Sequence, residues 1–212
     1  VYGNLKHSVI DELPLERKKI ESYWITDKKK QELYNFIYQH LKLGQQAFFV
    51  CPLIGETSSG ELKNVEALTE ELKSVFSPFE VKLLHGKMNV ETKQNLMQDF
   101  LKGDIKVLVS TTVIEVGIDV PNASIMVIEN AERFGLAQLH QLRGRVGRGN
   151  LKSYAFFVCN HNSDEARKRM RIIVKSKDGF QVAEEDLKLR GPGEFMGLKQ
   201  HGLPTLKLAN FK

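Results

Sequence analysis

Three arginines lie within six residues in the run from Gln138 to Gly149. If this run is helical, a turn of 3.6 residues places Gln141, Arg145 and Arg148 on one face. A guanidinium can bind two phosphate oxygens at once, so two arginines about one turn apart form a strong anion site. The opposite face of the same helix carries three apolar residues that can pack on a core: Leu139, Leu142 and Val146.

The same run contains Gly144, Gly147 and Gly149. Each glycine costs a helix about 1 kcal/mol relative to alanine, so their presence needs a reason other than stability. We expect them to let a large, charged partner surface come close. The alternative interpretation is a basic helix face that contacts only solvent.

A second polar group follows the apolar run Ile105–Val109. It begins with the hydroxyls of Thr111 and Thr112 and ends with Gly117 and Asp119. Hydroxyls and backbone amides at the end of a strand typically contact a nucleic-acid backbone without reading its bases. Asp119 is placed to accept a hydrogen bond from a ribose hydroxyl. Taken alone, the segment is equally consistent with a structural turn.

Two other segments resemble nucleotide-binding motifs but lack their chemistry. Gly55–Gly60 has the glycine spacing of a phosphate-binding P-loop, but Glu61 and Leu62 stand where that loop needs Lys and Ser or Thr. We interpret it as a flexible surface loop. The acidic pair in Val9–Glu12 follows only two apolar residues and precedes Pro14, which favours an ordinary linker over a magnesium site.

Composition places few limits on function. The chain has 212 residues, is 42% hydrophobic and carries a net charge of +5, which suits nucleic acid without establishing it. Cys51 and Cys159 lie in apolar runs without metal-ligand spacing, so we expect buried, reduced thiols and no metal site. No apolar stretch of 18 residues and no signal peptide is present, so no membrane association is expected.

The hydrophobic pattern alternates between strands and helices. Strands are expected at 19–25, 47–54, 80–84, 105–109, 124–128 and 154–159. Helices are expected from an N-cap at Asp27 to Gly44, at 65–76, ahead of Gly103, and over the arginine run. This order predicts an α/β fold with a mainly parallel sheet and helices on both faces. In such a sheet functional residues gather at the carboxyl ends of the strands or in the helices just after them.

The pattern changes after Cys159. Residues 164–176 are basic and helical, Asp178-Gly179 is a turn, and residues 180–187 are helical again, which predicts a helical hairpin. The stretch 189–202 contains four glycines and predicts an irregular loop.

These segments resemble the motifs of superfamily 2 helicases. The spacing Gln141-x-x-Gly144-Arg145-x-x-Arg148 resembles motif VI, and 110–121 resembles motif V. Phe49–Leu53 is similar to motif IV and His85–Met88 to motif IVa. The stretch from about 46 to 202 resembles the second RecA-like motor domain of the RecG family, including Pro192–Glu194 and Lys199–Gly202. Lys199 stands where that family commonly has arginine. The Mfd translocases share much of Phe134–Leu139 and the motif after it.

The RecG resemblance implies two parts: 1–160 as a second RecA-like helicase domain, and 161–212 as a helical hairpin and translocation loop. It implies the C-terminal motor half of an ATP-dependent DNA helicase that remodels stalled forks and Holliday junctions in repair and recombination. Walker A and B motifs are not found in the chain. We therefore expect Mg²⁺ to be held by an N-terminal motor domain outside it, and the isolated chain to be inactive.

The resemblance also implies residue roles. Gln141, Arg145 and Arg148 would contact ATP phosphates, with Arg148 as the arginine finger. Gly117, Asp119 and Gly144 would line the nucleotide cleft. Thr111, Thr112, His85 and Gly86 would contact DNA, and Arg169 and Gln200 would couple the hairpin to the loop.

The implied partners are branched DNA and, within the same full-length protein, an N-terminal RecA-like domain and a wedge domain. The expected protein is a monomer in the bacterial cytoplasm, associated with the nucleoid. Two alternatives stay open: an ATP-independent nucleic-acid-binding module that uses the basic hairpin, and the corresponding domain of an Mfd-type translocase.

Overall fold

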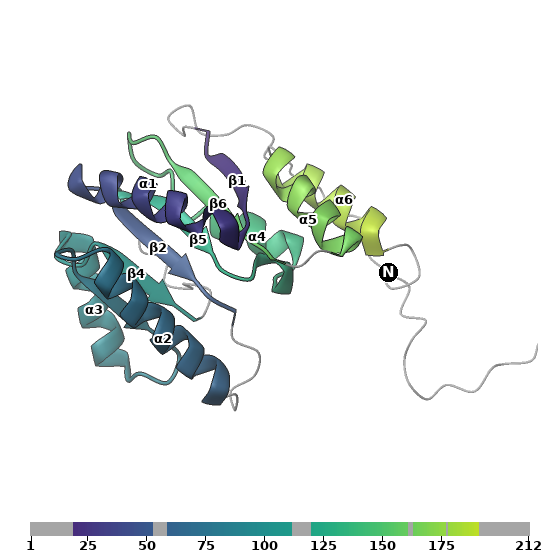
Figure 1. The fold of residues 1–212 in the computed structure, drawn as a ribbon. Helices are drawn as coiled ribbons and strands as arrows, with labels where there is room; N and C mark the ends of the chain where they lie inside the picture. The colour runs from purple at the N-terminus through teal and green to yellow at the C-terminus, as the bar shows by residue number, and fades with distance from the viewer. Residues whose placement is uncertain (1–18, 53–58, 112–119, 161–162, 177, 191–212) are drawn as a thin grey trace, which may run out of the picture.

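The computed structural model describes residues 19–52, 59–111, 120–160, 163–176 and 178–190, without the side chains of 59–61 and 190. Six strands form one sheet in the order β1-β6-β5-β2-β4-β3, and every pairing between them is parallel (Figure 1). The strands are β1 (Glu21–Ile25), β2 (Gln46–Val50), β3 (Val81–Leu84), β4 (Val107–Ser110), β5 (Ala123–Ile128) and β6 (Tyr154–Val158). The predicted parallel sheet is confirmed.

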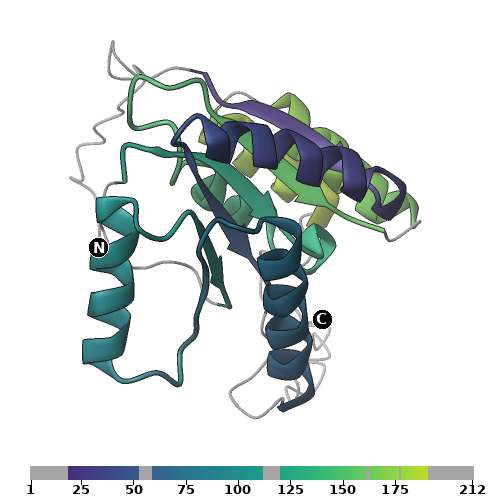
Figure 2. The ribbon, with the colours of Figure 1, turned by 60° about the vertical axis from the view of Figure 1, so that its left-hand side comes forward.

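Helices cover both faces of this sheet. One face carries α1 (Lys30–Lys42) and α2 (Ser59–Val75), and the other carries α3 (Val90–Lys102), α4 (Leu136–Arg143) and α5 (Asp164–Lys175). Helix α6 (Gly179–Arg190) forms the predicted hairpin with α5, on the side of the sheet opposite α1 (Figure 2). Two short 3-10 helices precede α1 and α4: η1 (Asp27–Lys29) and η2 (Ala131–Arg133).

Each layer of helices packs against its own hydrophobic cluster. Successive residues of a strand point to opposite faces of the sheet, so one strand contributes to both clusters. Along β2, Phe48 packs in the cluster with α3, α4 and α5, whereas Phe49 packs in the cluster with α1 and α2. Every residue of β2, β4, β5 and β6 is buried. A strand buried on both faces shows a continuous apolar run instead of an alternating one. This explains why the run at 47–54 predicted an interior strand, and Cys51 and Cys159 are buried free thiols as expected.

The centre of the sheet is a topological switch point. Strands β2 and β5 are neighbours, but α2 leaves β2 on one face and α4 leaves β5 on the other. In open α/β sheets, ligands bind outside the carboxyl ends of strands where the connections diverge in this way. The residues that follow β2 and β5 are therefore candidates for binding a ligand.

Some predicted helix ends are confirmed and others are wrong. Gly44 and Gly103 adopt the left-handed conformation that ends α1 and α3, with φ of 83° and 85°. Asp27 does not cap α1, because it lies inside η1, and the cap residue of α1 makes no side-chain bond. Helix α2 begins at Ser59, so Ser59 and Gly60 belong to a helix and not to the expected surface loop.

The helix through the arginine run is shorter than the spacing suggested. Helix α4 ends at Arg143 and is capped by Gly144, so Arg145 and Arg148 lie beyond it and do not share a helical face with Gln141. Gly147 has a φ of 79°, which a continuing helix does not allow. Leu142 and Val146 are nevertheless fully buried, as predicted.

Two glycines of this run, Gly147 and Gly149, are needed for packing within the domain. A Cβ on Gly147 would lie 3.0 Å from Cγ1 of Ile20, in addition to the strained φ. A Cβ on Gly149 would lie 2.6 Å from the carbonyl oxygen of Pro121. The carbonyl of Pro121 cannot rotate away as a side chain can. A larger residue at position 149 would therefore force these two chain segments apart.

We predict that Gly149→Ala destabilises the domain by about 1–3 kcal/mol, as overpacking of a filled site generally does. The matched control is Gly86→Ala, because a Cβ there meets no atom within 4 Å. Urea unfolding of both variants measures the difference. Equal stability of the two variants would contradict the close approach at Pro121.

Candidate functional site

Three buried polar atoms without a hydrogen-bond partner mark the carboxyl edge of the sheet. His85, Thr111 and Glu129 are the first residues after β3, β4 and β5. His85 Nδ1, Thr111 Oγ1 and Glu129 Oε1 are each buried and have no hydrogen-bond partner in the part of the chain that the structure describes. Buried polar groups are almost always hydrogen-bonded, so each exception needs a physical reason. Their position after neighbouring strand ends is what a ligand-binding edge would produce.

The expected nucleic-acid residues lie together at this edge. The backbone N–H of Thr111 donates to the carbonyl of Leu84 at 3.2 Å, which holds the end of β4 beside the end of β3. Gly86 is exposed, and Lys93 Nζ donates to its carbonyl oxygen at 2.7 Å. Thr111, His85 and Gly86 are therefore brought together, while Thr112 lies outside the described residues.

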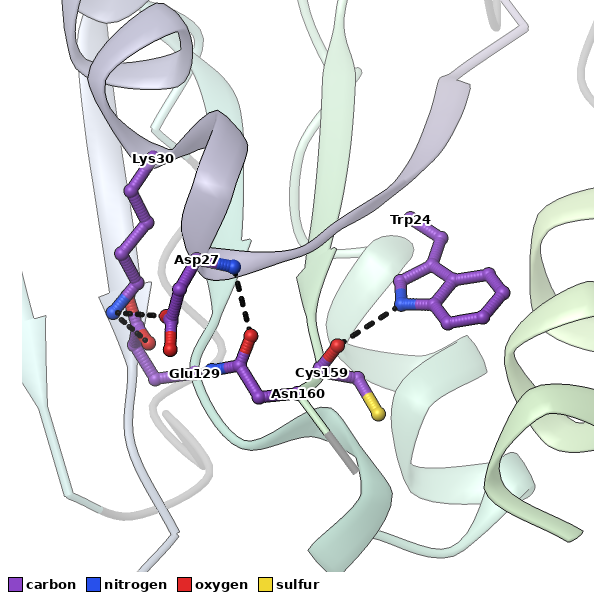
Figure 3. Close-up of polar contacts among 6 residues, drawn as sticks. All are labelled: Trp24, Asp27, Lys30, Glu129, Cys159 and Asn160. Atoms are coloured by element: carbon purple, nitrogen blue, oxygen red, sulfur yellow. Dashed lines mark hydrogen bonds and ion pairs between the residues drawn. The ribbon is translucent and has the colours of Figure 1, made fainter. Parts of the chain in front are cut away.

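An ion pair between the buried Glu129 and the partly buried Lys30 lies at the end of β5 (Figure 3). Lys30 Nζ lies 3.2 Å from Oε2 of Glu129 and 3.6 Å from Oδ1 of Asp27. Burial raises the pKa of the Glu129 carboxyl group, and Lys30 opposes that rise. Burial is the largest influence on Lys30 and lowers its pKa, but the charges and hydrogen bonds of Glu129 and Asp27 together outweigh it, so the net pKa of Lys30 is raised. The two groups are therefore coupled, since each one's charge favours the charged form of the other.

Further hydrogen bonds fix the chain around this pair. The backbone N–H of Asp27 donates to Oδ1 of Asn160 at 2.8 Å, and Trp24 Nε1 donates to the carbonyl of Cys159 at 3.1 Å (Figure 3). Both bonds join the end of β1 to the end of β6. The start of α1, which carries Lys30, is consequently fixed against the carboxyl edge.

A cavity of about 210 Å³ lies at this switch point between β2 and β5. It is lined by Lys30, Cys51, Pro52, Asn64, Val65, Leu68, Glu129, Asn130 and Arg133. Sequence reasoning did not identify Lys30 or Glu129. The available signal was an acidic residue directly after the apolar run 124–128, but the partner lysine lies 99 positions earlier and only the fold brings it close.

The first arginine of the run, Arg143, is a structural residue. It is buried, and its Nη1 donates to the carbonyl of Ile173 at 2.9 Å and to that of Ser176 at 2.8 Å. Its Nη2 donates to Nδ1 of His140 at 2.8 Å. A buried guanidinium is tolerated only when its donors are satisfied. Two of the acceptors come from the end of α5: Ile173 in its last turn and Ser176, its C-cap residue. Arg143 therefore fastens α4 to the hairpin.

Unlike the buried Arg143, three other polar residues of the run are partly or fully exposed: Gln141, Arg145 and Arg148. Gln141 and Arg148 are exposed and Arg145 is partly buried. Within the described residues, none of the three side chains has a hydrogen-bond or ion-pair partner. Three arginines of one short run thus divide into one that joins two helices and two whose guanidiniums remain available to an anion.

These two arginines lie beyond the helix in which the sequence pattern predicted them. Gly147 contacts Ile20, which precedes β1, and Gly149 contacts Pro121, which precedes β5. The segment after α4 has therefore reached the amino ends of the strands. The candidate residues form two groups, with His85, Gly86 and Thr111 at the carboxyl edge and the arginine segment near the opposite edge.

Arg169 is more than a solvated cation. Its Nη1 donates to the carbonyl of Glu132 at 3.0 Å, and its Nη2 donates to the carbonyl of Phe134. Both carbonyls belong to the segment that leads into α4. Helix α5 thus binds the entrance of α4 through Arg169, and α4 binds the end of α5 through Arg143.

Four predicted residues, Thr112, Gly117, Asp119 and Gln200, lie outside the described residues, as does most of the loop 189–202. Pro121, which Gly149 contacts, follows Asp119 by two positions in the sequence. In the described ranges no group of three or more potential metal ligands gathers, and no helix there is long and apolar enough to span a bilayer.

The parallel six-stranded sheet, its helical layers and the arginine segment define a RecA-like α/β domain of the helicase type. The fold agrees with the C-terminal domain of S. cerevisiae Dbp5, which matches with a TM-score of 0.52 over 80% of this chain and 98% of that one. At 19% identity this likeness shows the fold alone.

The chain belongs to the helicase conserved C-terminal domain family, whose model matches residues 28–150. The model of domain 3, C-terminal, of ATP-dependent DNA helicase RecG matches residues 176–212. ATP-dependent DNA helicase RecG of Thermotoga maritima is 50% identical to this chain over 210 residues, 99% of this chain and 27% of that protein.

A solved structure of RecG bound to a three-way DNA junction matches with a TM-score of 0.74 at 48% identity, over 93% of this chain and 25% of that one. The chain thus spans about a quarter of the length of these relatives. The RecG resemblance is confirmed, and the Mfd-type alternative is not favoured. The division at residue 160 stays a prediction.

We predict that Arg143→Met lowers the free energy of unfolding by about 2–4 kcal/mol, because two buried carbonyls lose charged donors. Arg148→Met should change it by less than about 0.5 kcal/mol, as is usual for exposed positions. Chemical denaturation of the two variants makes the comparison. Equal stability would mean that Arg143 does not fasten α4 to α5.

Proposed function

We propose that this chain is the C-terminal motor half of an ATP-dependent DNA helicase that remodels branched DNA. The observation that carries the proposal is the division of the arginine run. The guanidinium of Arg143 is hydrogen-bonded inside the fold, whereas those of Arg145 and Arg148 have no partner in the described residues. The two guanidiniums lie on a segment whose Gly147 and Gly149 pack closely against Ile20 and Pro121. Such guanidiniums suit phosphate oxygens, which accept paired N–H donors.

In this proposal Gln141, Arg145 and Arg148 face the phosphates of ATP, and Gly117, Asp119 and Gly144 line the same cleft. Transfer of the terminal phosphoryl group of ATP to water would supply the free energy for movement on DNA. The role of Arg148 is to stabilise negative charge that grows as the terminal phosphoryl group leaves. A Mg²⁺ ion would be held by the N-terminal RecA-like domain of the same protein, because the family resemblance assigns no metal ligands to this half.

The DNA path is assigned to the carboxyl edge of the sheet. Thr111, Thr112, His85 and Gly86 would contact the phosphate backbone there. The unpartnered Thr111 Oγ1 and His85 Nδ1 support this assignment, because a phosphate or bridging water would provide the missing hydrogen bonds. The related RecG was solved on a three-way DNA junction, which supports a branched substrate.

The intact protein would contain an N-terminal RecA-like domain and a wedge domain, act as a monomer, and work on the chromosome in the bacterial cytoplasm. Its relatives carry the name ATP-dependent DNA helicase RecG, which supports ATP as the cofactor. No observation favours a module that binds nucleic acid without ATP.

We predict that Arg148→Ala in the intact helicase lowers ATP turnover by about 10³- to 10⁵-fold, because an arginine finger acts mainly in the transition state. ATP binding should persist. The control is Lys42→Ala, an exposed cation at the end of α1, which should leave turnover unchanged. Steady-state hydrolysis and equilibrium ATP binding are measured together, and near-normal turnover of the Arg148 variant would reject the assignment.

We predict that Arg169→Ala or Gln200→Ala spares DNA binding and most ATP hydrolysis but abolishes strand displacement. Arg169 joins α5 to the backbone that leads into α4, so its loss should disconnect the hairpin from the arginine segment. ATP hydrolysis and fork unwinding are measured in parallel on the intact helicase.

Arg169→Lys is the matched control for this coupling, since it keeps the charge but cannot bond two carbonyls in the same geometry. Full unwinding by Arg169→Lys would show that only charge matters. A parallel fall of both activities in Arg169→Ala would show that the residue supports the fold and not the coupling.

A further inference from the structure

Helix α5 presents a row of cations that the fold does not use. Arg167, Lys168, Arg171 and Lys175 are all exposed. Within the described residues none of these four side chains forms a hydrogen bond or an ion pair. Spacings of four residues place Arg167, Arg171 and Lys175 along one side of the helix.

The rest of α5 already has partners. Its apolar side, Ala166, Met170 and Ile173, is buried in the cluster that covers one face of the sheet. Arg169 is engaged by the carbonyls that precede α4. The cation row is therefore the part of this helix that remains for an external partner, and it is not required to hold the hairpin in position.

The hairpin does not neutralise these cations internally. A groove of about 590 Å³ runs between α5 and α6 and has Lys168, Arg171 and Lys175 on its α5 wall. Glu184 and Glu185 stand on the α6 wall, but Lys188 lies 3.1 Å from Glu184 and 2.8 Å from Glu185. These two carboxylates are thus already paired on their own helix. Asp164 and Glu165, in the first turn of α5, are exposed and form no ion pair with the row within the described residues, so the four cations keep a net positive charge.

We propose that this row, Arg167, Lys168, Arg171 and Lys175, is a binding surface for the phosphate backbone of duplex DNA. This inference rests on the proposed function and assigns one further contact of its branched substrate. Cations four residues apart are about 6 Å apart along the helix axis, so the row is a continuous line of positive charge. The phosphate backbone of a duplex is a regular line of negative charge that such a row can follow. A rigid helix with this spacing suits the regular backbone of a duplex arm, whereas a single strand offers no fixed repeat.

The test measures the salt dependence of DNA binding by the intact helicase. The triple variant Arg167→Gln, Arg171→Gln and Lys175→Gln is titrated with a blunt duplex and with a single strand of equal length over a range of salt concentrations. Each lost phosphate contact lowers the slope of log K against log salt by about 0.9 for duplex DNA. The expected loss is therefore about 2 to 3 in slope for the duplex, with little change for the single strand.

A matched triple variant, Lys42→Gln, Lys73→Gln and Lys102→Gln, removes the same charge from the last turns of α1, α2 and α3, away from the carboxyl edge assigned to the DNA path. It should leave the duplex slope within about 0.5 of the unchanged protein. Arg171→Gln alone should lower the slope by about 0.9, which protects the test against a folding defect in the triple variant.

An unchanged duplex slope in the α5 variants overturns the proposal, and so does an equal loss in the matched control. A loss confined to the single strand rejects the duplex assignment. DNA-stimulated ATP hydrolysis of the unchanged helicase is followed in the same preparations. Its absence would overturn the proposed function, whereas the slopes report only on the α5 surface.

Discussion

The buried guanidinium of Arg143 connects the motor fold to the hairpin. A charged group at this depth must satisfy its donors, and the carbonyls of Ile173 and Ser176 are available only when α5 ends beside α4. Arg169 adds the reciprocal bonds from α5 to the chain before α4. The position of the hairpin is therefore set by charged hydrogen bonds with defined geometry, in addition to apolar packing that could be shifted at lower cost.

The parallel sheet explains why the candidate residues form two groups. Each connection in such a sheet must bring the chain back from the carboxyl end of one strand to the amino end of the next. The chain after β4 leaves the carboxyl edge at Thr111 and is again described at Val120, beside the start of β5. The chain after α4 also reaches the edge formed by the amino ends of the strands, where Gly149 lies against Pro121. The two described ends of the connection between β4 and β5 thus lie beside the two groups of candidate residues.

Sequence patterns predicted the sheet well because its strands are buried on both faces. Continuous apolar runs such as 47–50 and 124–128 are too short for most helices and fit a buried strand, and the helices between them carry regular stripes. The end of α4 could not be predicted in the same way. It depends on Gly147 and Gly149 packing against Ile20 and Pro121, which are distant in sequence. Local spacing therefore favoured a helix that tertiary contacts do not permit.

The same limit applies to the roles of like residues. Arg143, Arg145 and Arg148 are the same residue type within one run, and their neighbours in sequence do not distinguish them. What separates them is the presence of acceptors 30 and 33 positions away, which only Arg143 reaches. Helix α5 shows this division again: Arg169 finds acceptors in the motor fold, whereas Arg167 and Arg171 point to solvent. Counting basic residues thus overstates the charge available to a partner, and the available charge is what remains after the fold has satisfied its own carbonyls.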